Sequence, residues 1–299
     1  MRRSEQEYDG RTMHFRQLDS IGEMIDAMQH APEQQEQSDL GAASLRTDEE
    51  RWSGTRTMDE ALELARYGWE EGRQRLRQVV GRVAIDQLVG RRPIVESRLD
   101  FAGDEVDIGA YLHGEPEHMV DYQVRQDTHG KQAMMYVNAS MSSRVSSERI
   151  MQRGGALYAA IEALRTEGYS LGLTMVESTK ERDYHIRGVE YQIPVVQPGE
   201  YLDIDTAAFC LAHPAFLRRG VFALKEHEPN DIRYAMGYMV GGGYGEPTRM
   251  ASDLPPHSFL IDQGEGLDLR SDDDMQRFAQ KVVDRTLETL GHGPASDER

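Results

Sequence analysis

Apolar and polar positions alternate between helical and strand periods along this chain, and the clearest unit lies between residues 133 and 176. Residues 133–137 (AMMYV) form a continuous apolar run, which is typical of a strand buried on both faces. Apolar residues then recur at helical spacing over 150–164, and Gly168 follows as a helix terminator. A second apolar run, 171–176, comes next. A strand, a helix and a strand in this order predict two parallel strands of one sheet.

Two helices are predicted before this unit. Thr57 and Glu60 form a capping box, and apolar residues at helical spacing follow it as far as Trp69. A second helical pattern covers 76–88 and is expected to end near Gly90 and Pro93. Residues 94–101 and 119–125 are then predicted strands, separated by a segment rich in turn residues.

After residue 176 the pattern predicts shorter elements. Residues 189–196 alternate as a strand, and Pro194 places that strand at a sheet edge. Asp203 or Asp205 caps a helix that ends at Pro214, and a short helical segment covers 216–223. The remaining elements are a glycine loop (241–245), a strand (258–261) and a helix that begins at Asp272, Asp273 and Asp274 and extends to Leu287.

Together these elements predict an α/β fold: a doubly wound, mostly parallel sheet with helices on both faces, Rossmann-like, plus N-terminal helices. Residues 1–56 are expected to be a mostly disordered acidic segment with one helical stretch, 21–28, and a linker at 31–39. Residues 57–130 are expected to pack on the core as helices and strands. Residues 131–290 form the α/β core, and 291–299 form a disordered tail.

Composition narrows the class of function. The net charge of −18 argues against non-specific binding to nucleic acid and to anionic membranes, because both carry negative charge. Cys210 is the single cysteine, so no internal disulfide forms. No apolar run approaches the roughly 20 residues of a membrane span, and no secretory signal is visible at the N-terminus. We therefore expect a cytoplasmic protein.

The strongest candidate site follows the first buried strand. Asn138, Ser140 and Ser142 lie directly after 133–137, where ligands bind in open α/β sheets. Read conservatively, the serines only cap the next helix. The passage MMYVNASMSS, with the helix and strand that follow, resembles the von Willebrand factor A (vWA) family, whose Asp-x-Ser-x-Ser motif binds a divalent cation for adhesion. Asn138 stands where the family has aspartate.

The resemblance to the vWA family extends to a second segment. In FLIDQG (259–264), Asp262 is similar to a later aspartate of the family that follows a buried strand. The family's middle threonine has no clear counterpart here, and Thr206 is a weak candidate. The resemblance implies a vWA-like fold and a site of Asn138, Ser140, Ser142 and Asp262. Because Asn138 supplies no charge, that site should hold Mg²⁺ weakly or not at all.

A second resemblance concerns context. The segments 52–72, 106–120 and 208–226 are similar to uncharacterised proteins of tailed phages and prophages. This resemblance implies the cytoplasm of a phage-infected bacterium and no particular activity.

Several other residues are candidate binding groups. Glu177, at the end of the second parallel strand, lies near the crevice as a candidate base, and Arg218 and Arg219 are candidates for an acidic partner or a phosphate. The simpler interpretation of the two arginines is a solvated helix end. Cys210 and His213 have a metal-like spacing, but a zinc site needs four ligands and the chain has one cysteine.

The favoured function is protein binding through the crevice at the carboxyl ends of the strands. A phage or host protein is the expected partner, and an acidic group of that partner or a water network completes the site. Two alternatives stay open. One is an enzyme that uses Glu177 or Asp262 of the same crevice as acid or base. The other is a phage factor that acts on DNA or on the transcription machinery.

Overall fold

The structure is a computed structural model that describes residues 1–35, 44, 50–88, 94–125, 132–238 and 243–291. Predictions for 36–39, Gly90 to Pro93, 241–242 and 292–299 lie outside the described residues. Within them, a seven-stranded sheet has the strand order β1-β2-β8-β7-β6-β10, and β9 pairs with β7. Its strands are β1 (Arg2–Tyr8), β2 (Arg11–Gln17), β6 (Gln132–Asn138), β7 (Ser170–Lys180), β8 (Arg187–Val196), β9 (Glu246–Pro247) and β10 (Ser258–Ile261).

The centre of this sheet is mostly parallel. Strand β6 pairs in parallel with both β7 and β10, and β2 pairs in parallel with β8. The pairs β7–β8 and β1–β2 are antiparallel hairpins. Helix α7 (Ser147–Thr166) joins β6 to β7, so the predicted strand–helix–strand unit is confirmed.

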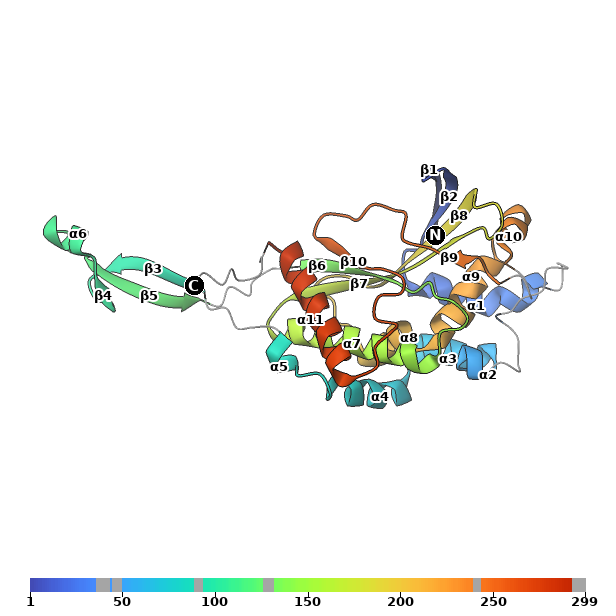
Figure 1. Cartoon of the computed structure of the whole chain (residues 1–299), viewed down its shortest axis with the longest axis horizontal. Helices are drawn as coiled ribbons and strands as arrows, with labels where there is room; N and C mark the ends of the chain where they lie inside the picture. Colours follow the sequence, from blue (N-terminus) through green and yellow to red (C-terminus); the bar gives the residue numbers. More distant parts are fainter. Residues whose placement is uncertain (36–43, 45–49, 89–93, 126–131, 239–242, 292–299) are drawn as a thin grey trace.

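The helices gather on one face of the sheet (Figure 1). Helices α7, α8 and α11 pack against each other below the strands, and α4 packs on α7 and α8 as a further layer. The bounds are α1 (Ile21–Gln35), α2 (Glu50–Ser53), α3 (Met58–Tyr67), α4 (Glu70–Val80), α5 (Ile85–Leu88), α8 (Ile204–Ala212), the π-helix η2 (Phe216–Val221), α9 (Phe222–Glu226), α10 (Asn230–Met236) and α11 (Asp272–Thr289).

The opposite face of the sheet differs from the prediction of helices on both faces. Over β6, β7 and β8 it carries the irregular segment 248–257, whose Met250 packs on Tyr136 and Val176. This segment contains Pro255 and Pro256, which remove backbone donors and prevent a helix. The sheet is therefore mostly parallel, but its second face is covered by an extended chain in this region.

Local signals fixed several helix ends. The Thr57 side chain accepts a hydrogen bond from the Glu60 amide at the start of α3, and Asp203 accepts from Asp205 and Thr206 at the start of α8. Ser271 makes a capping box with Asp274 at the start of α11. These three helix starts are as the caps predict.

The N-terminal segment departs from the expected disorder. Residues 2–17 form the hairpin β1–β2, and β2 extends the central sheet through β8. Arg16 of β2 is buried and pairs with Glu228 at 2.7 Å. The sequence cue for this hairpin is Asp9-Gly10, whose positive φ angles of 51° and 73° suit a tight β-hairpin turn.

Strand β8 is interior, although Pro194 predicted an edge. The pairing of β2 with β8 ends at Gln192, so Pro194 lies beyond the neighbour that would need its N–H. On the other side, the register with β7 shifts between Leu173 and Thr174. The proline is tolerated because the ladder is interrupted on both sides at its position.

A second, three-stranded sheet has the order β3-β5-β4, and in Figure 1 it stands apart from the rest of the structure. We call residues 94–125 the arm. It contains β3 (Ile94–Asp100), β4 (Glu105–Val106), α6 (Ile108–Leu112) and β5 (Met119–Arg125). The strands predicted at 94–101 and 119–125 are confirmed and pair with each other.

None of the described helices combines the length and the apolar character that crossing a membrane requires.

Candidate functional site

The loop at residues 139–146 connects the carboxyl end of β6 to the start of α7. Strands β6 and β7 are parallel neighbours, so both end on this side of the sheet. Ser146 caps α7 by accepting a hydrogen bond from the Arg149 amide. This arrangement creates a crevice between the loop, the end of β7 and the segment that returns at 243–247.

Two of the four residues predicted from the vWA resemblance contact each other. Asn138 donates from Nδ2 to Asp262 Oδ1 at 3.2 Å and to the carbonyl of Thr248 at 3.0 Å. Its Oδ1 accepts the amide of Ser140 at 2.9 Å. Asn138 and Asp262 meet because β10 lies beside β6 in parallel, so the carboxyl ends of the two strands share one sheet edge.

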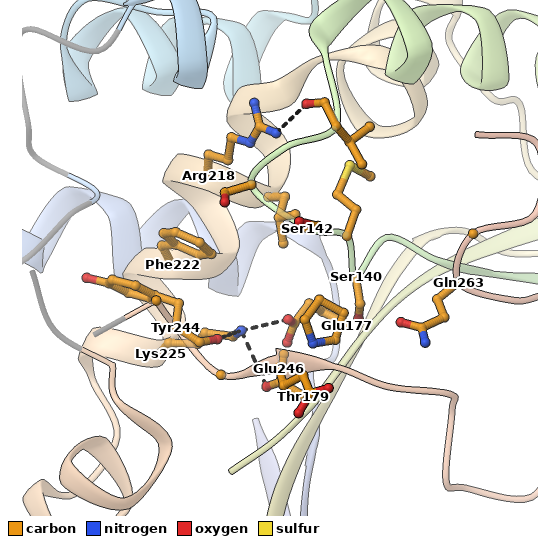
Figure 2. Close-up of a pocket in the computed structure, with 18 of the residues that line it drawn as sticks. Ser140, Ser142, Glu177, Thr179, Arg218, Phe222, Lys225, Tyr244, Glu246 and Gln263 are labelled. Atoms are coloured by element: carbon orange, nitrogen blue, oxygen red, sulfur yellow. Dashed lines mark hydrogen bonds and ion pairs between the residues drawn. The ribbon is translucent and has the colours of Figure 1, made fainter. Parts of the chain in front are cut away.

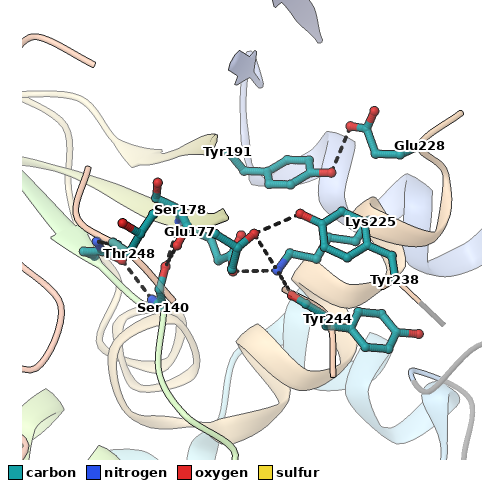
Figure 3. Close-up of polar contacts among 11 residues, drawn as sticks. Ser140, Glu177, Ser178, Tyr191, Lys225, Glu228, Tyr238, Tyr244 and Thr248 are labelled. Carbon is teal, nitrogen blue, oxygen red and sulfur yellow. Dashed lines mark hydrogen bonds and ion pairs between the residues drawn. The ribbon is translucent and has the colours of Figure 1, made fainter. Parts of the chain in front are cut away.

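The two serines have other partners. Ser140 Oγ donates to the carbonyl of Ser178 and accepts from its amide, at 2.9 and 2.7 Å, which ties the loop to β7 (Figure 3). Ser142 is exposed, and its Oγ accepts from the Arg144 amide. The structure thus brings Asn138, Asp262 and the Ser140 backbone together, while the serine hydroxyls serve the loop.

The donor set does not suit a cation in this arrangement. The Ser140 amide can only donate, so the oxygen of Asn138 must face it and the nitrogen must face Asp262. Asn138 therefore presents two N–H groups where Mg²⁺ would need an oxygen. Among the described residues, no cluster of three or more His, Cys, Asp or Glu side chains is placed to hold a metal.

Arg153 of α7 stabilises this junction from the helix side. Its guanidinium donates to the carbonyls of Asn138 at 3.1 Å, Asp262 at 3.3 Å and Glu265 at 2.7 Å. Burial lowers the pKa of Arg153 to about 10, which leaves it charged at neutral pH. Sequence reasoning missed this residue because it lies within an otherwise apolar helical stretch.

The crevice itself has a volume of about 730 Å³ and lies beside this junction (Figure 2). A volume of this size is typical of ligand sites. Its polar walls come from Ser142, Glu177 and Gln263, and its aromatic wall comes from Phe222 and Tyr244. Gly245 belongs here by necessity: its φ is +83°, and a side chain would lie 2.8 Å from Thr179 Cβ.

A buried ion pair forms the floor of the crevice. Lys225 Nζ donates to Glu177 Oε1 at 2.6 Å, to the Tyr244 carbonyl at 3.0 Å and to Thr179 Oγ1 at 3.4 Å (Figure 3). Nζ also lies 4.9 Å from the ring centre of Tyr238. Three acceptors and an aromatic face are the surroundings of a charged ammonium group.

Glu177 is less well satisfied than Lys225. Its Oε2 is buried and has no hydrogen-bond partner among the described residues. Burial raises the pKa of Glu177, against the opposing effect of Lys225, and burial lowers the pKa of Lys225, against the opposing effect of Glu177. Glu177 was predicted as a crevice residue, and it lines the crevice. Its Oε2 can still accept a hydrogen bond.

The predicted Arg218 also lines the crevice, but it is buried rather than solvated. It donates to the carbonyls of Trp52 and of Val145, and its guanidinium carbon lies 5.0 Å from the Trp52 ring centre. Burial lowers the pKa of Arg218 to about 10. In the described part of the chain, neither of these two hydrogen-bond partners is a carboxylate.

Arg219 points away from the crevice and is 1% exposed. It donates to the carbonyls of Ser44, Thr55 and Arg56 and to the hydroxyl of Ser53. The interpretation of a solvated helix end is therefore wrong for both arginines, because segments far away in sequence cover η2. Arg219 has a structural role.

Lys225, Trp52 and Tyr244 were missed as site residues. The signal for Lys225 was present: it is one of four lysines, and it follows directly on the apolar run 221–224 (VFAL). A charge beside such a run is expected to be buried with a partner. Trp52 and Tyr244 carried no signal, because their place depends on tertiary contacts alone.

Cys210 and His213 have structural positions, in line with the simpler interpretation. Cys210 is buried. His213 Nδ1 accepts the Ala215 amide at 3.1 Å, and the ring meets Trp69 edge-on at 4.5 Å.

A known family model matches almost the whole chain. The family model described as "Domain of unknown function (DUF7192)" matches residues 5–292. The chain belongs to this family. No curated protein and no solved structure matches the chain. Because the match includes the hairpin β1–β2 and α11, the whole fold, with its crevice, is the family's unit.

Proposed function

We propose that this member of the DUF7192 family is a protein-binding module whose crevice receives an acidic group of a partner polypeptide. The observation that carries the proposal is Arg218, a buried cation in the crevice wall. Its hydrogen bonds go to neutral carbonyls in the described structure. A carboxylate from a partner would supply the missing counter-charge through a charge-assisted hydrogen bond.

The opposite requirement of Glu177 supports a polypeptide ligand. Its Oε2 needs a hydrogen-bond donor, and a backbone N–H is such a donor. The aromatic side chains of Phe222 and Tyr244 stack at 4.0 Å between their ring centres and offer an apolar wall. An extended segment with one acidic side chain would meet all three requirements. Its carboxylate would pair with Arg218, a backbone N–H would donate to Glu177, and its apolar atoms would pack on Phe222 and Tyr244.

We also propose that the fold is vWA-like. This assignment is supported by the contact between Asn138, at the carboxyl end of β6, and Asp262, which follows the neighbouring β10. In our proposal Asn138 takes the place of the cation as a hydrogen-bond donor to Asp262, and Arg218 attracts the partner. The partner would come from the phage or from its bacterial host.

The test is site-specific photo-crosslinking with the full chain. A photoreactive residue replaces Ser142, which is exposed in the crevice, and the control replaces Tyr201, which is exposed outside it. We expect position 142 to crosslink one partner at a peptide that contains Asp or Glu. Replacing that acidic residue by Ala should weaken binding at least tenfold. Equal crosslinking from both positions, or unchanged affinity, would refute the proposal.

An enzyme is the second candidate, and the free Oε2 of Glu177 favours it. Of the two carboxylate oxygens of Glu177, Lys225 donates only to Oε1. The other oxygen, Oε2, is therefore placed to accept a proton from a substrate. Asp262 is a weaker candidate base, since its Oδ1 already accepts from Asn138 and Gln263. Turnover of esters or nucleotides by the purified protein, lost in Glu177→Gln with binding retained, would establish this function.

Action on nucleic acid receives no support from the arginines. Arg218 lines the crevice, where only a group that enters the crevice can meet it, and Arg219 is 1% exposed, so the two form no surface patch for a nucleic-acid backbone.

A further inference from the structure

The tip of the arm has an unusual distribution of apolar side chains. Helix α6 buries its Ala110 and exposes Ile108, Tyr111 and Leu112, at 70%, 60% and 76%. Phe101, at the end of β3, is 68% exposed. In a helix of a folded domain the large apolar residues normally face inward. Helix α6 has the reverse orientation.

This tip is a defined structure rather than a loose loop. Strand β4 pairs with β5 at Val120 and Met119, and Asp107 caps α6 by accepting from the Ala110 amide at 3.0 Å. Gly103 lies so close to β5 that a side chain would approach the Val120 carbonyl to 2.4 Å. The exposed side chains are therefore presented on a fixed backbone, which lowers the entropy cost of binding.

The charge around these apolar residues is predominantly negative, and Arg98, which pairs with Asp100, lies just before the acidic segment. Residues 99–121 contain seven carboxylates and no lysine or arginine. The carboxylates are Asp100, Asp104, Glu105, Asp107, Glu115, Glu117 and Asp121. Apolar side chains within an acidic rim are complementary to an apolar groove with a basic rim.

We infer that the tip of the arm docks into an apolar groove, rimmed by lysine and arginine, on a partner protein. This surface is separate from the crevice and goes beyond the proposed function. The chain's own charge of −18 disfavours a second copy as the occupant, since the copies repel each other. An anionic lipid surface is disfavoured for the same reason.

The probe for the test is a helical 18-residue peptide with leucine on one face and lysine on the other. Its counterpart has glutamate in place of lysine. Binding of both to the full chain is measured by fluorescence anisotropy at about 0.15 M salt, where charges beyond roughly 8 Å are screened. The variants are Ile108→Ser/Leu112→Ser, which removes apolar contacts, and Glu115→Gln/Glu117→Gln, which removes two charges of the rim. The control is Tyr201→Ser/Tyr234→Ser, which removes two exposed aromatic residues outside the arm.

We expect the lysine peptide to bind the wild type and the control alike. The affinity should fall at least tenfold in Ile108→Ser/Leu112→Ser and several-fold in Glu115→Gln/Glu117→Gln, and the glutamate peptide should not bind. Equal affinity of the wild type and Ile108→Ser/Leu112→Ser would overturn the inference, because overall charge alone would then explain binding.

Two further measurements test the rival occupants. Flotation with vesicles of phosphatidylcholine and phosphatidylserine (3:1) reports on a membrane, and sedimentation velocity reports on self-association. We expect no vesicle binding and a monomer. Vesicle binding, or a dimer, that Ile108→Ser/Leu112→Ser abolishes would replace the partner protein by a membrane or by a second copy. Loss of crosslinking at Ser142 does not affect these results, so the two proposals fail independently.

Discussion

Asn138 donates a hydrogen bond to Asp262 across 124 residues of sequence, because Asn138 ends β6, Asp262 follows β10 and the two strands are parallel neighbours. The amide nitrogen satisfies the carboxylate where the vWA resemblance implies a cation. The same asparagine accepts from Ser140, so one side chain connects the loop after β6 with the loop after β10.

Asn138→Asp should convert this contact into a pair of carboxylates. In EDTA we expect the variant to lose about 1–3 kcal/mol of stability, because two like charges share one site and the Thr248 carbonyl loses its donor. Mg²⁺ should restore the loss by supplying positive charge. Thermal unfolding with and without Mg²⁺ measures both effects. Asn138→Ala is the control and should not respond to Mg²⁺, and an equal response of the wild type would contradict the prediction.

Lys225→Met should be strongly destabilising. It leaves Glu177 buried without a counter-charge, which typically costs about 3–5 kcal/mol. Glu177→Gln in the same chain should recover most of the loss, since the uncharged amide needs no cation. Urea unfolding of the two single variants and the double variant measures the coupling between them. Additive losses would show that the pair does not interact.

Stability should decrease between about pH 6.5 and pH 4 through His213. Burial, with a contribution from Arg75, lowers the pKa of His213 to about 4. The unfolded chain binds this proton near pH 6.5 and the folded chain does not, so acid favours unfolding by up to about 3 kcal/mol. His213→Asn keeps an acceptor for the Ala215 amide and should flatten this part of the pH profile. An unchanged slope in the variant would exclude His213 as its source.

Removal of residues 1–17 should destabilise the whole fold. The truncation exposes the edge of β8 and leaves Glu228 without Arg16, although Tyr191 still donates to that carboxylate at 2.9 Å. Arg16→Met tests the ion pair alone and should cost about 3–5 kcal/mol. Chemical unfolding compares the three proteins. A truncated chain as stable as the full chain would restore the view that order begins near Thr57.

The sequence by itself determined the elements whose signals are local. The apolar run 133–137, the helix after it and the run 171–176 predicted two parallel strands, and Thr57, Asp203 and the acidic run 272–274 mark helix starts where the structure has them. These signals act within a few residues, through side-chain periodicity and hydrogen bonds to nearby amides. The resemblance to the vWA family also implied that Asn138 and Asp262 lie together at one sheet edge, where the structure has them.

The tertiary structure decided what each polar side chain faces. The strand β1 is polar and fully exposed, so no apolar pattern announced the hairpin that extends the sheet. Arg218 and Arg219 are buried because Ser44, residues 52–56 and Val145 cover them, and Lys225 meets Glu177 across 48 residues. Burial of a charge depends on contacts between distant segments, which residue spacing does not encode. For the same reason the orientation of Asn138, and with it the character of the site, was fixed only by its three partners in the folded chain.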